Sequence, residues 1–238
     1  MKDGTAAKCH GKETGNNEIV NNEIVNNEIM EAESMENKII YRNKRGCKAV
    51  FLDRDGTINV EKHYLYKTEQ FEYMDGAVEG MRALETMGFS LVVITNQSGI
   101  ARGYYTEKAY KKLEQWMIKD LAQRGVTIEK VYYCPHLPDA LLPEYRKDCR
   151  CRKPGTGLFW QACKELVVDM DSSFVVGDRM RDLCICQESG VRGILMTKKT
   201  VTKEELWGGD IFVCSDWYQV IERIRQQCRN RELEWKAD

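Results

Sequence analysis

Asp53 and Asp55 stand one residue apart, at the end of an apolar run and directly before Gly56. Paired carboxylates can hold a divalent cation, or they can divide the roles of nucleophile and proton donor. An ordinary turn is the alternative, because Asp-Gly is a common turn dipeptide. A calcium loop is excluded, because it requires a carboxylate or amide where the chain has Thr57 and a glutamate where it has Tyr64.

Two later polar segments would complete a site for a phosphate group. The segment at 95–103 begins with hydroxyl and amide side chains that suit phosphate oxygens, namely those of Thr95, Asn96, Gln97 and Ser98. Taken alone, this segment would be a polar loop between a strand and a helix. In the segment at 177–182, Asp178 follows another apolar run and would complete a magnesium site with the first acidic pair. Asp182 would cap the following helix or orient Asp178.

Three cysteines and one histidine have the spacing of a closed zinc site. They are Cys134, His136, Cys149 and Cys151, with twelve residues between His136 and Cys149. Three thiolates and one imidazole complete a tetrahedron and leave no position for a substrate, so we predict a structural zinc ion. The next residues, Arg152 and Lys153, are tethered to this loop and are predicted to form a phosphate clamp. Elsewhere, two such cations would be a solvated surface pair.

The elements that position these residues alternate along the chain. Strands are predicted from short apolar runs at 49–52, 91–94, 131–133, 174–176 and 193–196. Helices are predicted from apolar residues at helical spacing within 78–87, 110–121 and 217–228. Strands that are apolar throughout and alternate with helices predict an α/β fold, a doubly wound parallel sheet covered on both faces.

The predicted sheet also indicates where the site lies. Ligands bind beyond the carboxyl ends of the strands in such a sheet. Asp53, Thr95, Cys134 and Asp178 each follow a predicted strand. We therefore expect these four residues to lie along one edge of the sheet.

Composition narrows the class of protein. The formal net charge of −1 provides no basic field for nucleic acid or an anionic membrane. The chain shows neither a secretory signal nor an apolar stretch that approaches a membrane span. Ten cysteines in this setting favour reduced thiols and metal ligation over disulfides. We expect a cytoplasmic protein that binds neither nucleic acid nor membranes.

The first part of the chain has a repetitive sequence that differs from the rest. Residues 16–30 read NNEIV, NNEIV, NNEIM, and a fivefold spacing aligns the isoleucines on neither a helical nor a strand face. We therefore expect residues 1–45 to be a disordered tail and residues 46–230 to form the folded domain that carries the phosphate site.

With these segments in order, the chain resembles the haloacid dehalogenase (HAD) superfamily of phosphotransferases. The matching motifs are DRDGT, the loop at Thr95, Lys153 and GDRMRD. More narrowly, residues 48–225 are similar to the D-glycero-D-manno-heptose 1,7-bisphosphate 7-phosphatases through FLDRDGTINV, VVITNQSGIARG, YYCPHLP, CRCRKP and FVVGDRMRDL. The histidinol-phosphate phosphatases share the zinc ligands, but their loop between the histidine and the second cysteine pair is typically shorter.

The resemblance implies a mechanism that agrees with the residues. Asp53 would attack phosphorus and form an aspartyl-phosphate, while Asp55 would protonate the leaving hydroxyl and then activate water. Mg²⁺ would be held by Asp53, the backbone carbonyl of Asp55, and Asp178. Thr95 and Lys153 would bind the oxygens of the transferred phosphoryl group.

The resemblance also implies which residues bind the sugar phosphate. They are Glu61, Lys62, His63, Tyr64, Asn96, Gln97, Ser98, Arg152 and Arg179. Arg179 stands where the heptose enzymes often have lysine, which keeps the charge but replaces a point charge with a planar fork. The intervals of 41 residues between Asp53 and Thr95, and of 57 between Thr95 and Lys153, leave no room for a folded cap domain.

The predicted fold is therefore a capless, haloacid dehalogenase-like sheet with a zinc-binding loop. The predicted protein is a monomeric heptose bisphosphate phosphatase that uses Mg²⁺, with Zn²⁺ in a structural role. Two alternatives remain at this point: a histidinol-phosphate phosphatase, and a zinc-ordered binding module that has lost catalysis.

Overall fold

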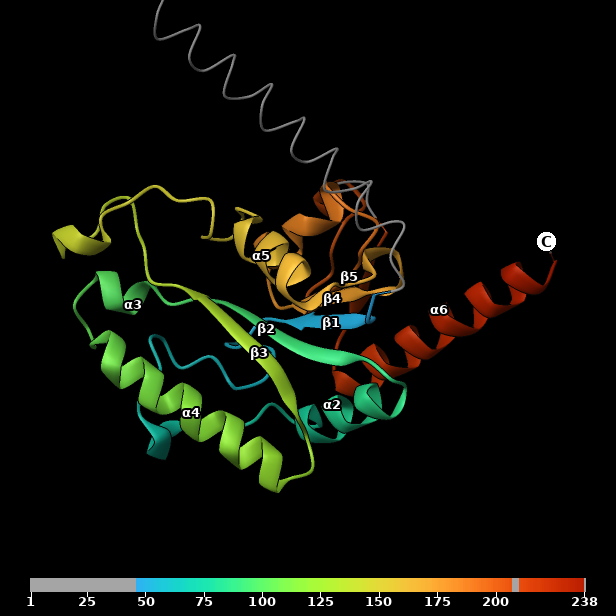
Figure 1. Cartoon of the computed structure of the whole chain (residues 1–238), viewed down its shortest axis with the longest axis horizontal. Helices are drawn as coiled ribbons and strands as arrows, with labels where there is room; N and C mark the ends of the chain where they lie inside the picture. Colours follow the sequence, from blue (N-terminus) through green and yellow to red (C-terminus); the bar gives the residue numbers. More distant parts are fainter. Residues whose placement is uncertain (1–45, 207–209, 238) are drawn as a thin grey trace, which may run out of the picture. The chain divides into compact units, whose positions relative to one another are not determined.

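A computed structural model describes residues 46–206 and 210–237, with side chains as far as residue 231. The predicted tail, residues 1–45, lies outside the described residues. In the described part, six parallel strands form one sheet in the order β3-β2-β1-β4-β5-β6 (Figure 1). They are β1 (Ala49–Leu52), β2 (Ser90–Asn96), β3 (Ile128–Cys134), β4 (Phe174–Gly177), β5 (Arg192–Met196) and β6 (Ile211–Cys214). The predicted doubly wound parallel sheet is confirmed.

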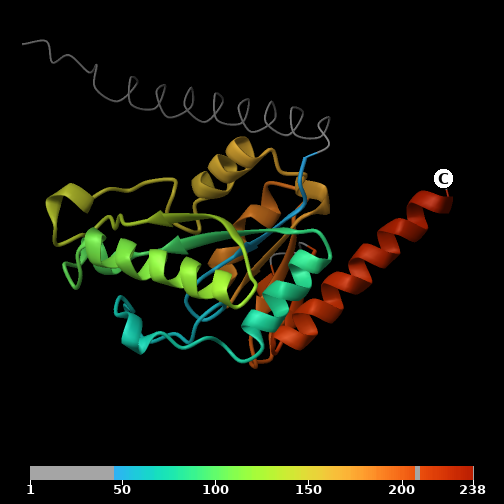
Figure 2. The same ribbon diagram turned by 60° about the horizontal axis from the view of Figure 1, so that its bottom comes forward.

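The two faces of the sheet are covered by different helices (Figures 1 and 2). One face packs against α2 (Ala77–Thr86), α4 (Glu107–Gln123) and α6 (Trp217–Ala237). The other packs against α5 (Gly157–Leu166) and the 3-10 segment η4 (Met180–Gln187). The short elements are α3 (Ser98–Ala101), η1 (Thr68–Gln70), η2 (Pro143–Tyr145), η3 (Met170–Ser172) and η5 (Glu204–Leu206).

Strand β1 shows why the apolar runs are continuous. Val50 and Leu52 face the helices α2, α4 and α6, whereas Ala49 and Phe51 face α5 and η4. All four side chains are fully buried. Because successive strand residues point to opposite faces, a strand between two helical layers must be apolar at every position.

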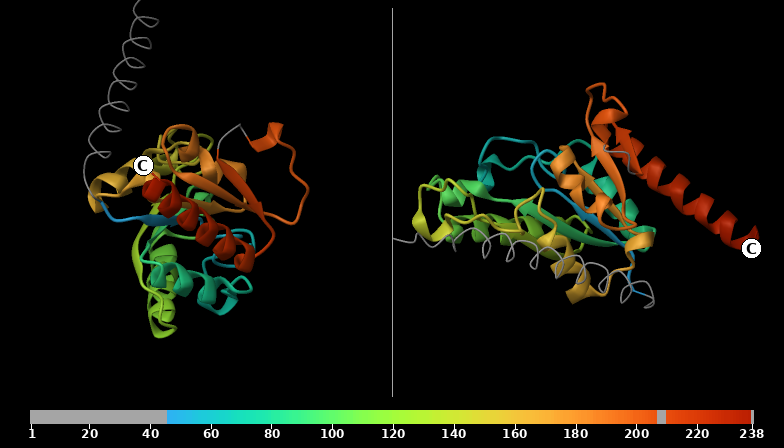
Figure 3. Two further views of the ribbon diagram at one scale, coloured as in Figure 1. Left: turned by 90° about the vertical axis from the view of Figure 1, so that its right-hand side faces the viewer. Right: turned by 90° about the horizontal axis from the view of Figure 1, so that it is seen from above.

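Local signals set the ends of α4, which begins and ends where the sequence predicts. The Thr106 hydroxyl at its N-terminus accepts a hydrogen bond of 3.1 Å from the amide of Ala109. Gly125 follows the helix with a φ of 74°, a left-handed conformation that glycine adopts without steric cost. The helix α6 is longer than its apolar stripe, and its C-terminal end extends away from the sheet (Figure 3, red).

Two features of the fold position the site. The chain runs from β1 outward through β2 to β3, and then returns to β4 on the other side of β1. The carboxyl ends of β1, β2 and β4 therefore meet at a topological switch point. Between β1 and β2 the chain forms only η1 and α2, and α2 belongs to the core, so the described residues contain no cap domain there.

No helix in the described residues has the length and apolar character needed to cross a membrane.

Candidate active site and metal centre

A cavity of about 260 Å³ opens at the carboxyl ends of the strands. Its lining includes most of the residues predicted from the sequence, which are Asp53, Asp55, Glu61, His63, Tyr64, Thr95, Asn96, Gln97, Ser98, Arg152, Lys153 and Arg179. It also includes Asp182, which was expected to cap a helix or orient Asp178, and three residues that the sequence analysis did not assign to a site, which are Arg102, Tyr105 and Arg181. The polar ends of three strands and the loops after them thus converge as expected for this type of sheet.

Lys153 occupies the floor of the cavity and is almost fully buried, with 3% of its surface exposed. Its ammonium group donates hydrogen bonds of 2.7 Å to Asp53 Oδ1 and 2.7 Å to the carbonyl of Ile94. It also lies 2.8 Å from Asp182 Oδ1. Burial lowers the pKa of Lys153, but Asp182 and Asp53 outweigh this effect and raise the pKa above its ordinary value. The residue is therefore a fixed positive charge beside Asp53.

Three acidic residues form a cluster around this charge. Carboxylate oxygens of Asp53, Asp178 and Asp182 lie within 4.8 Å of one another. Burial raises the pKa of Asp53 to about 7, an effect that Lys153 opposes and Asp182 reinforces. Burial and the Asp182 charge likewise raise the pKa of Asp178 to about 6. Carboxylates that repel one another in a polar cavity are suitable ligands for a hard divalent cation, so the donor set fits Mg²⁺.

Glycines allow the acids to approach so closely. Gly56, in the Asp-Gly pair of the first motif, has a φ of 84°, and a Cβ atom there would lie 2.5 Å from Asp178 Oδ2. A Cβ atom on Gly177 would lie 2.4 Å from the Cβ atom of Asp182. Asp182 also accepts a hydrogen bond of 3.0 Å from the amide of Arg179, which confirms its predicted capping role.

Asp55 is held by partners that the sequence analysis did not identify. The buried guanidinium of Arg54 donates to Asp55 Oδ2 at 2.8 Å. Asn59 Nδ2 donates to Oδ1 at 3.1 Å, and Gln97 Nε2 donates to Oδ2 at 3.2 Å. Tyr105 in turn donates to Gln97 Oε1 at 2.7 Å. These bonds leave the Asp55 carboxylate little rotational freedom while it faces the cavity.

The loop after β2 supports the site as well as lining it. The Thr95 hydroxyl, which is buried, accepts a hydrogen bond of 2.9 Å from Gln97 Nε2. Asn96 accepts a hydrogen bond of 3.0 Å from the amide of Lys153 and donates one of 3.0 Å to its carbonyl. Asn96 therefore fixes the backbone of the buried lysine, in addition to its predicted contact with substrate.

Three of the four residues at 61–64 line the cavity. Glu61, His63 and Tyr64 line the cavity, but Lys62 is not among the lining residues and pairs with Glu72 at 2.7 Å. Arg179 lies 3.3 Å from Glu61 and 3.5 Å from Asp178, so two acids neutralise much of its charge.

Three other arginines that line the cavity, Arg102, Arg152 and Arg181, have a different environment. Arg152 is half-buried and donates to the carbonyl of His136 at 3.3 Å. Burial lowers the pKa of Arg152, and the charges of Arg181 and Arg102 lower it further. The guanidinium groups of Arg181 and Arg102 therefore lie close enough to repel that of Arg152.

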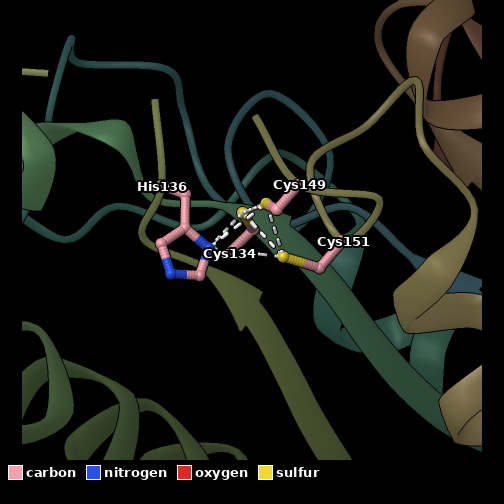
Figure 4. Close-up of side chains that lie close together, drawn as sticks. All are labelled: Cys134, His136, Cys149 and Cys151. Atoms are coloured by element: carbon pink, nitrogen blue, oxygen red, sulfur yellow. Dashed lines mark hydrogen bonds between the residues drawn. The ribbon is translucent and has the colours of Figure 1, made fainter. Parts of the chain in front are cut away.

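The four predicted zinc ligands converge at the end of β3 (Figure 4). The three sulfur atoms lie 2.8–3.4 Å apart, and His136 Nδ1 lies 3.2–3.7 Å from them. A tetrahedral zinc ion with Zn–S bonds of about 2.3 Å separates its sulfur ligands by about 3.8 Å. Four donors that all neighbour one another, drawn from thiols and an imidazole, fit such an ion after a small outward shift. Lys153 comes two residues after the last of them.

Comparison of the sequence and the fold with known proteins shows the class of protein to which the chain belongs. Residues 48–203 match the family model described as polynucleotide kinase 3 phosphatase. The fold is similar to a crystal structure of a HAD-like phosphatase from Mesorhizobium loti, with a TM-score of 0.68, 29% identity and coverage of 77% of this chain and 88% of that chain. The fold and the site thus define a HAD-like phosphatase.

Two further comparisons narrow the family. The D-glycero-beta-D-manno-heptose-1,7-bisphosphate 7-phosphatase of Photorhabdus laumondii is 42% identical over 186 residues, which are 76% of this chain and 99% of that protein. A D,D-heptose 1,7-bisphosphate phosphatase from B. bronchiseptica, crystallised with magnesium and phosphate, has a TM-score of 0.63 and 29% identity, covering 76% of this chain and 99% of that chain. The chain belongs to the family of D-glycero-D-manno-heptose-1,7-bisphosphate 7-phosphatases, which confirms the resemblance stated from the sequence motifs.

Proposed function

We propose that this protein removes the 7-phosphate of D-glycero-D-manno-heptose 1,7-bisphosphate through an aspartyl-phosphate intermediate. One observation carries the proposal: Asp53 lies at the end of β1 between a buried ammonium and two further acids, in a cavity open to substrate. The names of the relatives supply the sugar substrate, and the neighbour crystallised with magnesium and phosphate supports the choice of metal.

Asp53 is the nucleophile in this mechanism. Bound Mg²⁺, held by Asp53, Asp178 and the backbone carbonyl of Asp55, would neutralise the acid cluster and the phosphate oxygens that face it. The Asp53 carboxylate attacks phosphorus in line, and Lys153 and Thr95 bind the phosphoryl oxygens. Because Lys153 is already fixed by Ile94 and Asp182, little reorganisation is required when negative charge develops.

Asp55 carries the proton. It protonates the leaving sugar oxygen in the first step, and in the second step it takes a proton from the water that hydrolyses the aspartyl-phosphate. The hydrogen bonds from Arg54, Asn59 and Gln97 keep its carboxylate in one orientation for both steps. Substrate contacts come from the predicted residues that line the cavity, among them Glu61, His63 and Ser98.

A structural zinc ion would act on this centre indirectly. Bound by Cys134, His136, Cys149 and Cys151, it would fix the loop that carries Arg152 and Lys153. Asn96 holds the same stretch of backbone from the β2 side. The buried lysine is thus anchored from two directions. All of these residues belong to one chain, and we expect the enzyme to act as a monomer.

Phosphate release by the purified protein tests the proposal. The substrates are both anomers of the heptose bisphosphate, histidinol phosphate and a 3′-phosphorylated oligonucleotide, each assayed with Mg²⁺ and in EDTA. We expect turnover of the heptose bisphosphate to exceed that of the other two, and to require Mg²⁺ while the zinc content stays constant. Faster turnover of histidinol phosphate or of the oligonucleotide would refute the substrate assignment, and no Mg²⁺-dependent release from any of them would refute the enzyme.

A further inference from the structure

Three arginines from separate parts of the chain line one wall of the active-site cavity. Arg102 ends α3, Arg152 follows the last predicted zinc ligand, and Arg181 belongs to η4. All three line the cavity that also contains Asp53. Both Arg102 and Arg181 lie within segments that carry the family resemblance, but neither has a role in the mechanism above.

The guanidinium groups on this wall lack anionic partners. The Nε atoms of Arg102 and Arg181 are buried and have no hydrogen-bond partner. Among the residues that the structure describes, Arg102, Arg152 and Arg181 form no ion pair with a carboxylate. Buried polar groups normally have partners, so unsatisfied donors on two residues that line one cavity point to arginines whose hydrogen bonds a ligand would complete.

Arg179 provides a contrast within the same cavity. Its guanidinium lies beside Glu61 and Asp178, at 3.3 Å and 3.5 Å, so its charge is compensated inside the protein. An anion that approached Arg179 would have to compete with both carboxylates. Among the described residues, Arg102, Arg152 and Arg181 have no such carboxylate partner, so an anion beside them meets no competitor and offsets the charge of several guanidinium groups at once.

Resting on the proposed function, we propose that Arg102 and Arg181, together with Arg152, bind the second anionic group of the substrate, the phosphate that is not transferred. Planar guanidinium groups bind phosphate through paired N–H donors, and such charge-assisted bonds are the stronger class of hydrogen bond. This wall therefore selects a sugar bisphosphate over a monophosphate.

The test measures discrimination between two substrates that differ only in that phosphate. It compares kcat/KM for the heptose 1,7-bisphosphate with kcat/KM for the heptose 7-phosphate, and repeats the comparison with one hexose bisphosphate and its monophosphate. The variants are Arg102→Gln, Arg181→Gln, the double variant and Arg181→Lys. Arg225→Gln is the control, because Arg225 is exposed on α6 and pairs with Glu222 away from the cavity.

The expected change is confined to the bisphosphate. Loss of one charge-assisted bond reduces binding by about 10-fold or more, so the double variant should lose about 100-fold in kcat/KM for the bisphosphate. Its kcat/KM for the 7-phosphate should change by less than about threefold, since the removed groups make no contact with that substrate. Arg181→Lys should retain part of the discrimination, and Arg225→Gln all of it.

Other results would overturn the inference, the proposed substrate or both. An equal loss for both substrates, or no loss for either, would overturn the inference while leaving the phosphatase assignment intact. Acceleration of 7-phosphate turnover by inorganic phosphate, up to the bisphosphate rate, would instead assign the wall to a separate ion and overturn the selection of substrate. Discrimination on the hexose pair without heptose turnover would refute the proposed sugar only, and the absence of any turnover would refute both proposals.

Discussion

Two clusters of ligating side chains lie at the carboxyl edge of the sheet, and their chemistry is opposite. The zinc cluster gathers four donors of soft or borderline character, which complete a tetrahedron among themselves. The acid cluster gathers three carboxylates, and burial together with the charge of Asp182 raises the pKa values of Asp53 and Asp178. A closed donor set suits a structural role. An open, self-repelling set requires a cation and a substrate to complete it.

The largest expected effect comes from the nucleophile in the acid cluster. Asp53→Asn removes the attacking carboxylate but keeps the size of the side chain, so activity should fall below about 1% of wild type. The zinc content and the melting temperature should stay near those of wild type. Residual phosphate release above that level, on either anomer of the substrate, would exclude Asp53 as the nucleophile.

The buried pair of Lys153 and Asp182 comes next. Both side chains are 2% exposed, so Asp182→Ala leaves an ammonium partly uncompensated in the interior. The free energy of unfolding should fall by about 3–5 kcal/mol. Glu222→Ala, which breaks the exposed pair with Arg225, should cost less than about 1 kcal/mol. Similar losses in the two variants, measured by urea denaturation, would contradict the structural role assigned to Asp182.

Disruption of the zinc cluster should affect the active site at a distance. Cys149→Ala removes one predicted ligand, so the loop that carries Lys153 loses one of its two anchors. We expect loss of zinc, measured by metal analysis, and an increase in KM of about 10-fold. Kinetic constants identical to those of wild type in a zinc-free variant would show that Lys153 is positioned without the help of zinc.

The acid cluster should make the stability of the protein depend on pH. In magnesium-free protein, the folded-state pKa values of about 7 for Asp53 and about 6 for Asp178 exceed the ordinary value of 3.8. Between the ordinary and the raised values the folded state binds more protons than the unfolded state, so stability falls as the pH rises toward 7. Melting curves at a series of pH values should show this slope, which saturating Mg²⁺ and Asp53→Asn should both reduce. A flat profile would mean that the acids do not repel one another as described.

The smallest effect is expected from the predicted tail. Removal of residues 1–45 leaves all the cavity residues and both clusters in place. We expect kcat/KM to stay within about twofold of the full chain, because no residue proposed for catalysis is lost. A larger loss would assign the NNEIV repeats a part in catalysis or in folding of the domain.

Most of the fold could be predicted from the sequence because its signals are local. Continuous apolar runs identified five of the six strands, and the helix-capping residues Thr106 and Gly125 marked α4. Strand β6 was missed although its sequence, Ile-Phe-Val-Cys, is as apolar as that of β1, and in the structure it lies at the edge of the sheet with Val213 exposed. The helix α5 was also missed, although Thr156, a residue type that favours the N-cap position, directly precedes it; in the structure the Thr156 side chain forms no capping hydrogen bond.

The site was predicted only in part, because some of its contacts join segments that are distant in the sequence. Residue types and spacing indicated the four residues of the Cys/His cluster and the carboxylates Asp53 and Asp178, and the structure brings each group together. Pairings between distant segments carry no local signal. Arg54 stands between two aspartates and resembles a surface charge, yet it is buried and bound to Asp55. Similarly, no sequence feature indicates that Lys62 pairs with Glu72 while Arg181 faces the cavity.

The most direct test of the central claim is a crystal structure with Mg²⁺ and beryllium trifluoride, which mimics a phosphoryl group on a carboxylate. We predict a beryllium–oxygen bond to Asp53, the metal ion on Asp53 and Asp178, and Lys153 within hydrogen-bonding distance of a fluoride. Beryllium on another residue, or Lys153 turned out of the cavity with the ligand present, would contradict the account.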